Sequence, residues 1–426
     1  MKTRIFLLFI LLPSIALSQI RFDDFFFNKS LRFDYLLGGN KTDVQVYPVQ
    51  MKKEPFWAGP QNNLFDLFNY GTYRFRVIDQ ASDNLIFSKG FCTLFQEWQT
   101  TAEAKTKNKT FYHSAVFPFP KQKVQLVIEA RQWSGDFKEI FSTIIDPDDY
   151  FILDEQPVLY DTVQLVSNGM PKDMVDIVVL AEGYSQQEKQ KFYDDVRRVS
   201  DYLFKEEPFQ SEKDKFNVTA VFTPSKDSGT DIPGEGIYRN TIFNSSFYTF
   251  DISRYLTTSD IKGIYDAAAG VPYDFIYILV NSERYGGGGF YNLVTVCTAD
   301  NKLTKEVFVH EFGHGFGGLS DEYYSSTVAY EDYYNLDIEP WEPNITTLKN
   351  FEKKWESMVA DSVPTPTPAI PKYNKCVGVF EGGGYVSKGI YRPYIDCRMK
   401  SNEAHSFCPV CQEALKKVIY FYADLQ

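Results

Sequence analysis

Positive charge is scarce in this sequence. Its 44 lysine and arginine residues are outnumbered by 56 aspartate and glutamate residues, so the 426 residues carry a formal net charge of −12. No stripe or block of basic residues offsets this balance anywhere along the chain. Because nucleic acids bind to positively charged surfaces, the composition argues against a nucleic-acid partner.

Long apolar runs are also missing, except at the start of the chain. Met1–Arg4 is positively charged, Ile5–Leu17 is mostly apolar, and small residues precede Gln19. This order predicts a signal peptide at residues 1–18. The run is shorter than the about 20 residues that span a bilayer, so a retained membrane anchor is the less favoured alternative. We therefore expect a mature protein that is secreted, periplasmic or held at the cell surface.

Histidine occurs only four times, yet two of the four lie in one stretch, His310–Tyr323. On a helix His310 and His314 are one turn apart and can bind one ion, and two neutral imidazoles suit Zn²⁺. Glu311, beside the first histidine, can take a proton from the attacking water. A chance HExxH on a solvated helix is the alternative, but the largely apolar segment Lys305–Val309 favours a buried helix and a zinc site.

From Gln19 to about Asp154 the hydrophobic pattern has a period of two and no sustained helical periodicity. Tyr73–Val77 alternates cleanly, and Val124–Ala130 places alternate residues on one face. Short strands separated by turn residues are typical of a sandwich, so we expect an all-β sandwich domain at residues 19–155. No catalytic constellation is visible in this part, which is either a scaffold or a surface that binds substrate.

The rest of the chain, residues 156–426, mixes apolar runs with amphipathic patterns. Ser185–Glu188 has the form of a capping box, and apolar residues from Phe192 to Leu203 mark one face of a helix before Pro208. The segments that we expect to be strands are Met174–Leu180, Phe216–Phe222 and Phe275–Val280. Strands that alternate with helices predict an α/β (α+β) domain.

Two further segments of this part of the chain are expected to border an active-site cleft. Gly286–Gly289 reads as an exposed strand or turn whose bare backbone can pair with an extended peptide. Residues 325–372 form a long irregular segment, and a loop of this length inside a domain commonly has a function. We expect it to wall the cleft.

The stretch HEFGHGFGGLSDEY is similar to the long zinc signature of metzincin metallopeptidases, HExxHxxGxxH with His or Asp at its end. Ile395–Asn402 contains Met399, which follows the helix as the methionine of a metzincin Met-turn does. Together with the β-rich N-terminal part and the closing FCPVC, essentially the whole mature chain resembles the bacterial immunoglobulin A peptidase family. The resemblance implies a metzincin-like zinc peptidase domain at residues 156–426.

Carried over by position, the resemblance implies one catalytic zinc ion with His310 and His314 as ligands. Glu311 is then the general base, and Met399 forms a hydrophobic floor under the metal without binding it. The third ligand departs from the pattern, because the position three residues after Gly317 is Ser320, which binds zinc poorly. We expect Asp321, one residue further on, to be the third ligand.

The alternative third ligand is Glu322, and the cysteines leave a second question open. Cys397, His405, Cys408 and Cys411 offer the donors of a structural zinc site. Disulfide bonds are favoured in an exported protein, with Cys376–Cys397 and Cys408–Cys411 as possible pairs.

The function that we expect is that of a secreted zinc metalloendopeptidase which cleaves extracellular proteins, immunoglobulin A or mucin-like glycoproteins among them. A non-catalytic protein that binds glycoproteins or surfaces with the same fold is the main alternative. Against it stands the intact HExxH, because a binding protein has no need of Glu311. A zinc hydrolase acting on an amide in a glycan or cell wall is a third, less favoured reading, and the oligomeric state stays open.

Overall fold

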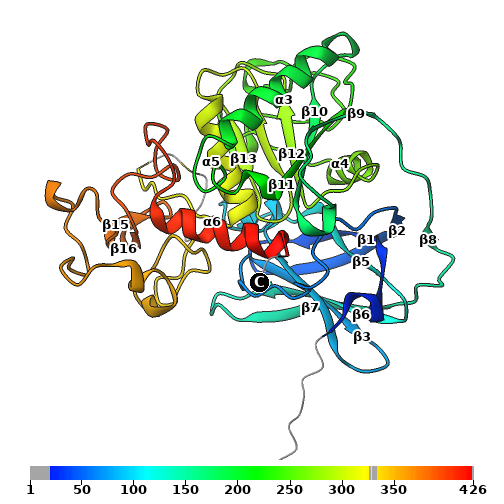
Figure 1. Cartoon of the computed structure of the whole chain (residues 1–426), viewed down its shortest axis with the longest axis horizontal. Coiled ribbons are helices and arrows are strands. Elements are labelled where there is room, and N and C mark those ends of the chain that lie inside the picture. The colour runs from blue at the N-terminus through cyan, green and yellow to red at the C-terminus, as the bar shows by residue number, and fades with distance from the viewer. Residues whose placement is uncertain (1–19, 326–327, 329–332, 425–426) are drawn as a thin grey trace, which may run out of the picture.

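The computed structural model describes residues 20–325, 328 and 333–424. Figure 1 shows a strand-rich region in blue and cyan below a mixed α/β region in green and yellow. The C-terminal helix α6 (Pro409–Tyr422), in red, crosses between them. The chain therefore has a mostly-β region followed by a mixed α/β region, as expected. The predicted signal peptide lies outside the described residues, and no helix within the described ranges has the length and apolar character to cross a membrane.

The N-terminal region consists of two four-stranded sheets that share one core. Phe33 and Phe141 lie on opposite sheets with ring centroids 5.9 Å apart, and Phe75 and Phe117 face each other at 6.0 Å. The first sheet has the order β5-β1-β2-β8, with β1 Phe26–Gly39, β2 Val44–Glu54, β5 Lys109–Pro120 and β8 Ile152–Leu153. The second has the order β4-β3-β6-β7, with β3 Tyr73–Asp79, β4 Leu85–Phe91, β6 Val124–Arg131 and β7 Phe137–Ile145.

Two short helices in this region have no counterpart in the sequence analysis. Helix α1 covers Phe22–Phe25, and helix α2 covers Leu94–Gln99. The hydroxyl of Thr93 caps α2 by accepting a hydrogen bond from the Gln96 N–H at 3.0 Å. Both helices are too short to show helical periodicity in the sequence, but α2 lies beside the site described below.

The second region is built on a six-stranded sheet of order β13-β14-β12-β10-β11-β9. The central strands β10 (Val175–Glu182), β11 (Phe216–Phe222), β12 (Phe275–Val280) and β14 (Thr295–Thr298) are parallel. The edge strands β9 (Asp161–Val166) and β13 (Gly287–Gly289) run antiparallel to their neighbours. The three strands predicted from apolar runs are thus confirmed as β10, β11 and β12.

Helices cover both faces of this sheet, which is why its central strands read as continuous apolar runs. On β10, Ile177 and Val179 contribute to one core, and Val178 and Leu180 contribute to the other. Helix α4 (Ile261–Ala268) lies on the second of these faces. The first face carries α6, α3 (Lys189–Leu203) and α5 (Thr304–Gly317). The predicted capping box is present at the start of the α3 segment, where the Ser185 and Glu188 side chains each accept a hydrogen bond from the backbone N–H of the other residue.

Buried charges join the two regions. The Arg32 guanidinium of β1 lies 2.9 Å from the Glu54 carboxylate and 2.7 Å from that of Asp266 on α4. The hydroxyl of Tyr273 donates a hydrogen bond to Glu54 at 2.9 Å. Since the Arg32 side chain is fully buried, loss of either carboxylate would leave a buried cation short of partners. The chain itself passes from β8 in the first region to β9 in the second, and the domain boundary at residue 155 stays a prediction.

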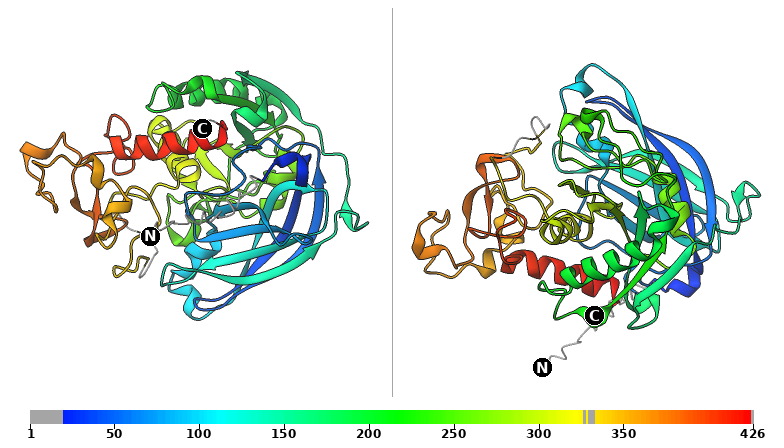
Figure 2. Two further views of the ribbon diagram at one scale, coloured as in Figure 1. Left: turned by 60° about the horizontal axis from the view of Figure 1, so that its bottom comes forward. Right: turned by 90° about the horizontal axis from the view of Figure 1, so that it is seen from above.

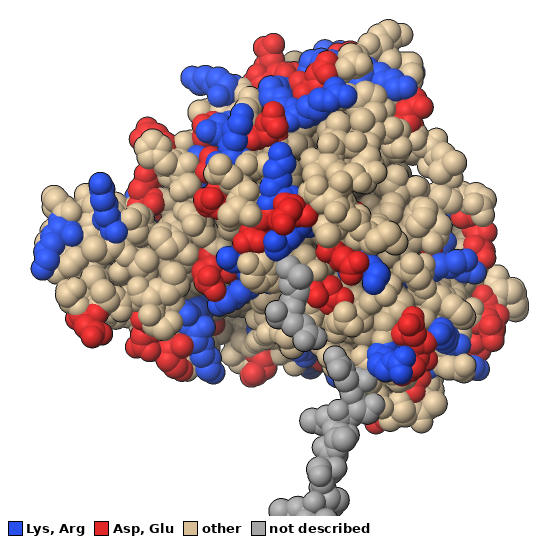
Figure 3. All heavy atoms as spheres, viewed as in Figure 1, with Lys and Arg blue, Asp and Glu red and all other residues tan. Residues whose placement is uncertain are grey.

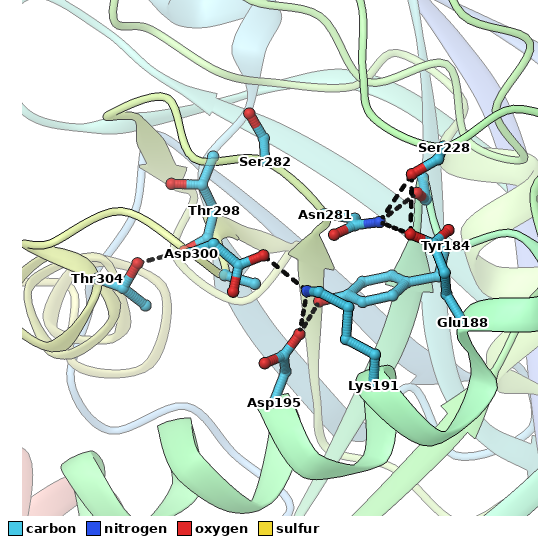
Figure 4. Close-up of polar contacts among 12 residues, drawn as sticks. Tyr184, Glu188, Lys191, Asp195, Ser228, Asn281, Ser282, Thr298, Asp300 and Thr304 are labelled. Atoms are coloured by element: carbon cyan, nitrogen blue, oxygen red, sulfur yellow. Dashed lines mark hydrogen bonds and ion pairs between the residues drawn. The ribbon is translucent and has the colours of Figure 1, made fainter.

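A polar network fixes the lead-in to helix α5 against helix α3 (Figure 4). Lys191 of α3 donates to the carboxylates of Asp195 and Asp300, each at 2.6 Å. The hydroxyl of Thr304 donates to the Thr298 carbonyl at 2.9 Å, at the end of β14. These contacts set where α5 begins, and therefore where its later residues lie.

The segment after α5 projects to one side of the molecule. Both views in Figure 2 show it in orange, on the side opposite the blue strands of the first sheet. It carries the hairpin β15 (Phe380–Gly383) and β16 (Val386–Arg392). Acidic and basic side chains lie interspersed on the face that Figure 3 shows.

We expect Asp300→Asn to lower the free energy of unfolding by about 1 kcal/mol, because it removes a charged acceptor of a partly buried network. Asp194→Asn on α3 is the matched control, since its ion pair with Arg197 is largely exposed and its loss should cost no more than about 0.5 kcal/mol. Chemical denaturation followed by tryptophan fluorescence measures both. Equal effects would show that the network does not anchor the α5 lead-in.

Candidate active site

Helix α5 presents two imidazoles on the face opposite its buried aromatic side chains. Phe308 stacks on Tyr277 of β12 with ring centroids 4.1 Å apart, and Phe316 contacts Phe275 at 4.8 Å. His310 and His314 therefore point away from the sheet, with their Nε2 atoms 3.1 Å apart. The predicted HExxH helix is present, and its buried face explains why the turn before it is apolar.

Main-chain carbonyls orient both imidazoles. The Nδ1 atom of His310 is 2.9 Å from the Arg398 carbonyl oxygen, and that of His314 is 2.6 Å from the Leu319 carbonyl oxygen. Because a carbonyl only accepts, both Nδ1 atoms carry the proton in these bonds. The Nε2 lone pairs are then free for a metal ion, in the arrangement that metal-binding histidines commonly show.

Asp321 completes a triangle of donor atoms. Its Oδ1 atom lies 3.1 Å from His310 Nε2 and 3.3 Å from His314 Nε2. Gly318, with a φ of 60°, ends α5 in the left-handed conformation and turns the chain back toward the histidines. The Tyr385 hydroxyl donates to the other carboxylate oxygen at 2.5 Å. Ser320 is not part of this group, since its hydroxyl lies 2.8 Å from that of Tyr334.

This triangle fits a tetrahedral zinc ion. Ligands about 2.0–2.2 Å from zinc in tetrahedral geometry stand about 3.3–3.5 Å from one another, close to the three separations observed. Asp321 Oδ1 is buried, and among the described residues no hydrogen bond of normal geometry reaches it. The lone pairs of these three atoms are directed at one point, an arrangement that a bound cation stabilises. His310, His314 and Asp321 form one of two groups in the described chain that could hold a metal ion.

The charges of this group shift the pKa values of its own members. Burial alone would lower the pKa of His314, but the Asp321 carboxylate outweighs it and raises the pKa to about 9. Burial would raise the pKa of Asp321, but the two imidazoles hold it far below its usual range. The group is therefore built around a compensating positive charge.

Glu311 lies between the histidines and strand β13. A Cβ atom at Gly287 would be 2.8 Å from the Cγ and 2.9 Å from the Oε1 of Glu311, and one at Gly289 would be 2.5 Å from its carbonyl oxygen. Burial raises the pKa of Glu311, whereas His310 and His314 lower it. A partly buried carboxylate with a raised pKa is suited to accept and return a proton.

The glycines of β13 serve a purpose that the sequence analysis did not anticipate. Their bare backbone lets α5 approach closely, and the outer edge of β13 already pairs with Tyr255 at Gly287. The prediction that this backbone is exposed and free to pair with an extended peptide is therefore wrong at Gly287. A strand at this position is confirmed, and its role is to bring Glu311 beside the histidines.

Met399 packs against helix α5 at Gly313. It is fully buried, and its sulfur would be 2.7 Å from a Cβ atom at Gly313, between His310 and His314 on α5. The Met399 carbonyl also accepts a hydrogen bond from the Glu322 N–H at 2.8 Å. The turn at Met399 thus supports both helix α5 and the segment that carries Asp321 and Glu322.

Both regions of the molecule line the cleft above this group, which has a volume of about 280 Å³. The N-terminal region contributes Cys92, Gln96 and Glu97, around the start of α2. The Tyr255 hydroxyl donates to the Glu97 carboxylate and links this wall to the α/β region. The long irregular segment contributes Tyr333, Tyr334, Trp341 and Glu342, which confirms that its described part walls the cleft.

Four further cleft residues were not singled out as site residues from the sequence. They are Arg254, Tyr285, Tyr323 and Tyr385. The charge of Arg254 lowers the pKa of Glu311, although burial and the histidines have larger effects. Of these four, only Tyr323 is near the histidines in the sequence, within the DEY segment, so only this residue could have been predicted as part of the site. The fold brings the other three to the cleft from more distant parts of the chain.

The cysteines follow neither sequence-based alternative. All six are unpaired thiols, so the suggested pairs Cys376–Cys397 and Cys408–Cys411 are absent from the described chain. His405 is exposed and does not belong to the group that the other three predicted donors form.

An HExxH helix with an acidic third donor, at the edge of a mixed sheet, defines a metallopeptidase. The comparisons agree: the family model described as IgA Peptidase M64 matches residues 163–375 and 369–419. The model described as Peptidase M64 N-terminus matches residues 21–142. The chain belongs to the IgA peptidase M64 family. No curated protein matches it.

We expect Asp321→Asn to weaken zinc binding by more than about 100-fold, because loss of a ligand should exceed the about 10–100-fold cost of losing a supporting hydrogen bond. Ser320→Ala, one residue away, should leave the affinity unchanged. Competition with a chromophoric chelator measures both. The assignment of the third donor is wrong if the serine variant loses zinc and the asparagine variant keeps it.

Gly289→Ala should lower the free energy of unfolding by roughly 1–3 kcal/mol, since its methyl group meets main chain of α5. Gly270→Ala is the control, because its nearest neighbours would lie 3.5 Å away. Thermal unfolding of the two variants side by side gives the comparison. A Gly289 variant as stable as the control would show that α5 has room to move.

Proposed function

We propose that this chain is a secreted zinc-dependent endopeptidase that hydrolyses peptide bonds of extracellular proteins. The observation that carries the proposal is the triangle of His310, His314 and Asp321 with the partly buried Glu311 carboxylate beside it. These are the parts of a site that activates water against an amide. A protein that only binds a partner needs none of them in this arrangement.

When bound by His310, His314 and Asp321, a zinc ion would polarise the scissile carbonyl and lower the pKa of a water molecule. Glu311 acts as the general base and accepts the proton of the attacking water. Its burial raises its pKa, so the protonated form is stable enough to hand the proton on to the leaving amine. The Arg398 and Leu319 carbonyls keep both imidazoles oriented throughout.

We further propose that the arrangement is metzincin-like. Met399 packs under α5 at Gly313, as the resemblance to that group implies. Asp321 takes the role of the third ligand one residue later than the metzincin pattern, and the left-handed turn at Gly318 supports this shift.

The substrate is an extracellular protein, with immunoglobulin A and mucin-like glycoproteins as the first candidates. The family name motivates immunoglobulin A, and the predicted signal peptide at residues 1–18 motivates an extracellular substrate. A cleft walled by both regions suits a chain segment that lies across the junction. Terminal-peptide analysis of digests of immunoglobulins and mucins would identify the bonds cleaved.

Glu311→Gln should reduce peptide cleavage by at least about 1,000-fold, because general acid–base catalysis alone contributes about 10²–10⁴-fold. The zinc content should stay unchanged, since Glu311 is not among the three donors. Glu306→Gln, five residues earlier on α5, is the control and should cleave normally.

A peptide library digested with and without a chelator provides the readout. Cleavage by the wild type that stops on chelation and is absent in Glu311→Gln is the expected result. Cleavage retained by Glu311→Gln would remove the general base from the proposal. No cleavage under any condition would favour the glycoprotein-binding alternative.

A further inference from the structure

A second group of metal-type donors lies directly behind the acidic turn. It consists of Glu322, Cys397, Cys408 and Cys411, whose side-chain donor atoms all lie within 4.8 Å of one another. All four residues are buried, with exposed fractions of 0% to 3%. They come from three separate parts of the chain: the turn after α5, the segment before Met399, and the start of α6. The group shares no residue with His310, His314 and Asp321.

The separations match a metal site better than a disulfide bond. The Cys397 and Cys411 sulfurs are 3.7 Å apart, whereas a disulfide requires about 2.05 Å. Two thiolates on one tetrahedral zinc ion, each about 2.3 Å from it, stand about 3.8 Å apart. The Cys411 sulfur is 3.2 Å from Glu322 Oε1, which suits a mixed sulfur and oxygen donor set.

One donor of this group lacks a protein partner. Glu322 Oε2 is fully buried and has no hydrogen-bond partner among the described residues. The nearby Arg392 guanidinium makes no hydrogen bond to it, and its Nη1 atom donates instead to the carbonyls of Glu381 and Gly382. A buried carboxylate among three thiols is costly unless a cation compensates it. An ion at the centre of the group would supply that charge.

Two backbone features at this group suit negatively charged sulfur. The N–H of Cys408 donates to the Cys397 sulfur at 3.2 Å. Cys408 is the N-cap of the 14-residue helix α6, where the helix dipole stabilises negative charge.

We propose that Glu322, Cys397, Cys408 and Cys411 bind a second, structural zinc ion. Three thiolates and a carboxylate fill a tetrahedral coordination sphere and leave no position for substrate, so the ion holds the fold. Thiolates select Zn²⁺ over harder divalent cations. The proposal does not depend on peptidase activity.

The position of this ion gives it a role beside the candidate active site. Glu322 is adjacent to Asp321, and Cys397 is adjacent to Arg398, whose carbonyl orients His310. The ion ties these two segments to the first turn of α6. It therefore fixes two of the groups that position the histidine pair.

Zinc analysis by mass spectrometry of the purified full chain tests the proposal. We expect about two zinc ions per chain in the wild type and about one in His310→Ala/His314→Ala. Cys408→Ser/Cys411→Ser should also lose one ion. Cys376→Ser, a partly exposed cysteine outside the group, is the matched control and should keep both.

Cobalt substitution of His310→Ala/His314→Ala covers the case in which the double cysteine variant fails to fold. Thiolate-to-cobalt charge-transfer absorption in this variant would support the proposal, because only the sulfur group can produce it. Two results would overturn the proposal: zinc that disappears entirely in that variant, or a wild-type mass lower by two hydrogens that reveals a Cys408–Cys411 disulfide. Neither result would bear on the Glu311 test of peptidase activity.

Discussion

Helix α5 lies against strand β13 more closely than any side chain on the inner face of that strand would allow. Gly287 and Gly289 make this contact possible, because a Cβ atom at either would meet Glu311. On its other side α5 is held by the stack of Phe308 on Tyr277. The rotation of the helix is thus set from two directions, and with it the direction in which the histidines and Glu311 point.

Two other segments converge on this helix: the acidic turn that follows it directly and the distant segment around Met399. The Arg398 carbonyl that orients His310 lies 88 residues further along the chain. The turn at Gly318 returns Asp321 to the histidines, and the Met399 carbonyl holds the next residue, Glu322, from below. No single segment contains the site. Its geometry depends on the packing of α5, the acidic turn and the methionine turn as one unit.

The long periodic segments were predictable because local sequence and burial agree there. Strands β10, β11 and β12 and the capping box before α3 follow from apolar runs and cap residues. The histidine pair follows from its spacing. Asp321 was the favoured third donor, but its selection over Glu322 depends on where the turn at Gly318 and the rest of the fold place each carboxylate, which spacing alone does not determine.

Other features depend on contacts between distant residues and could not be read from the sequence. Helix α2 is too short to show a period. The sequence suggested His405 as the fourth donor beside the three cysteines, but the fold places Glu322 there instead. From the sequence, we expected the glycines of β13 to form a strand edge open to a peptide. In the structure their backbone packs closely against helix α5, which begins 15 residues after the strand ends.

The placement of Gln96 and Glu97 on the cleft wall bears on how this protein can change over evolutionary time. The Asn292 amide, close to β13, donates to the Gly90 carbonyl of β4, so the two regions cannot drift apart freely. Yet α2 carries no part of the histidine group. Substitutions there can change the shape of the cleft wall without replacing any member of the histidine group, so the N-terminal region is where the dimensions of the cleft can vary most freely.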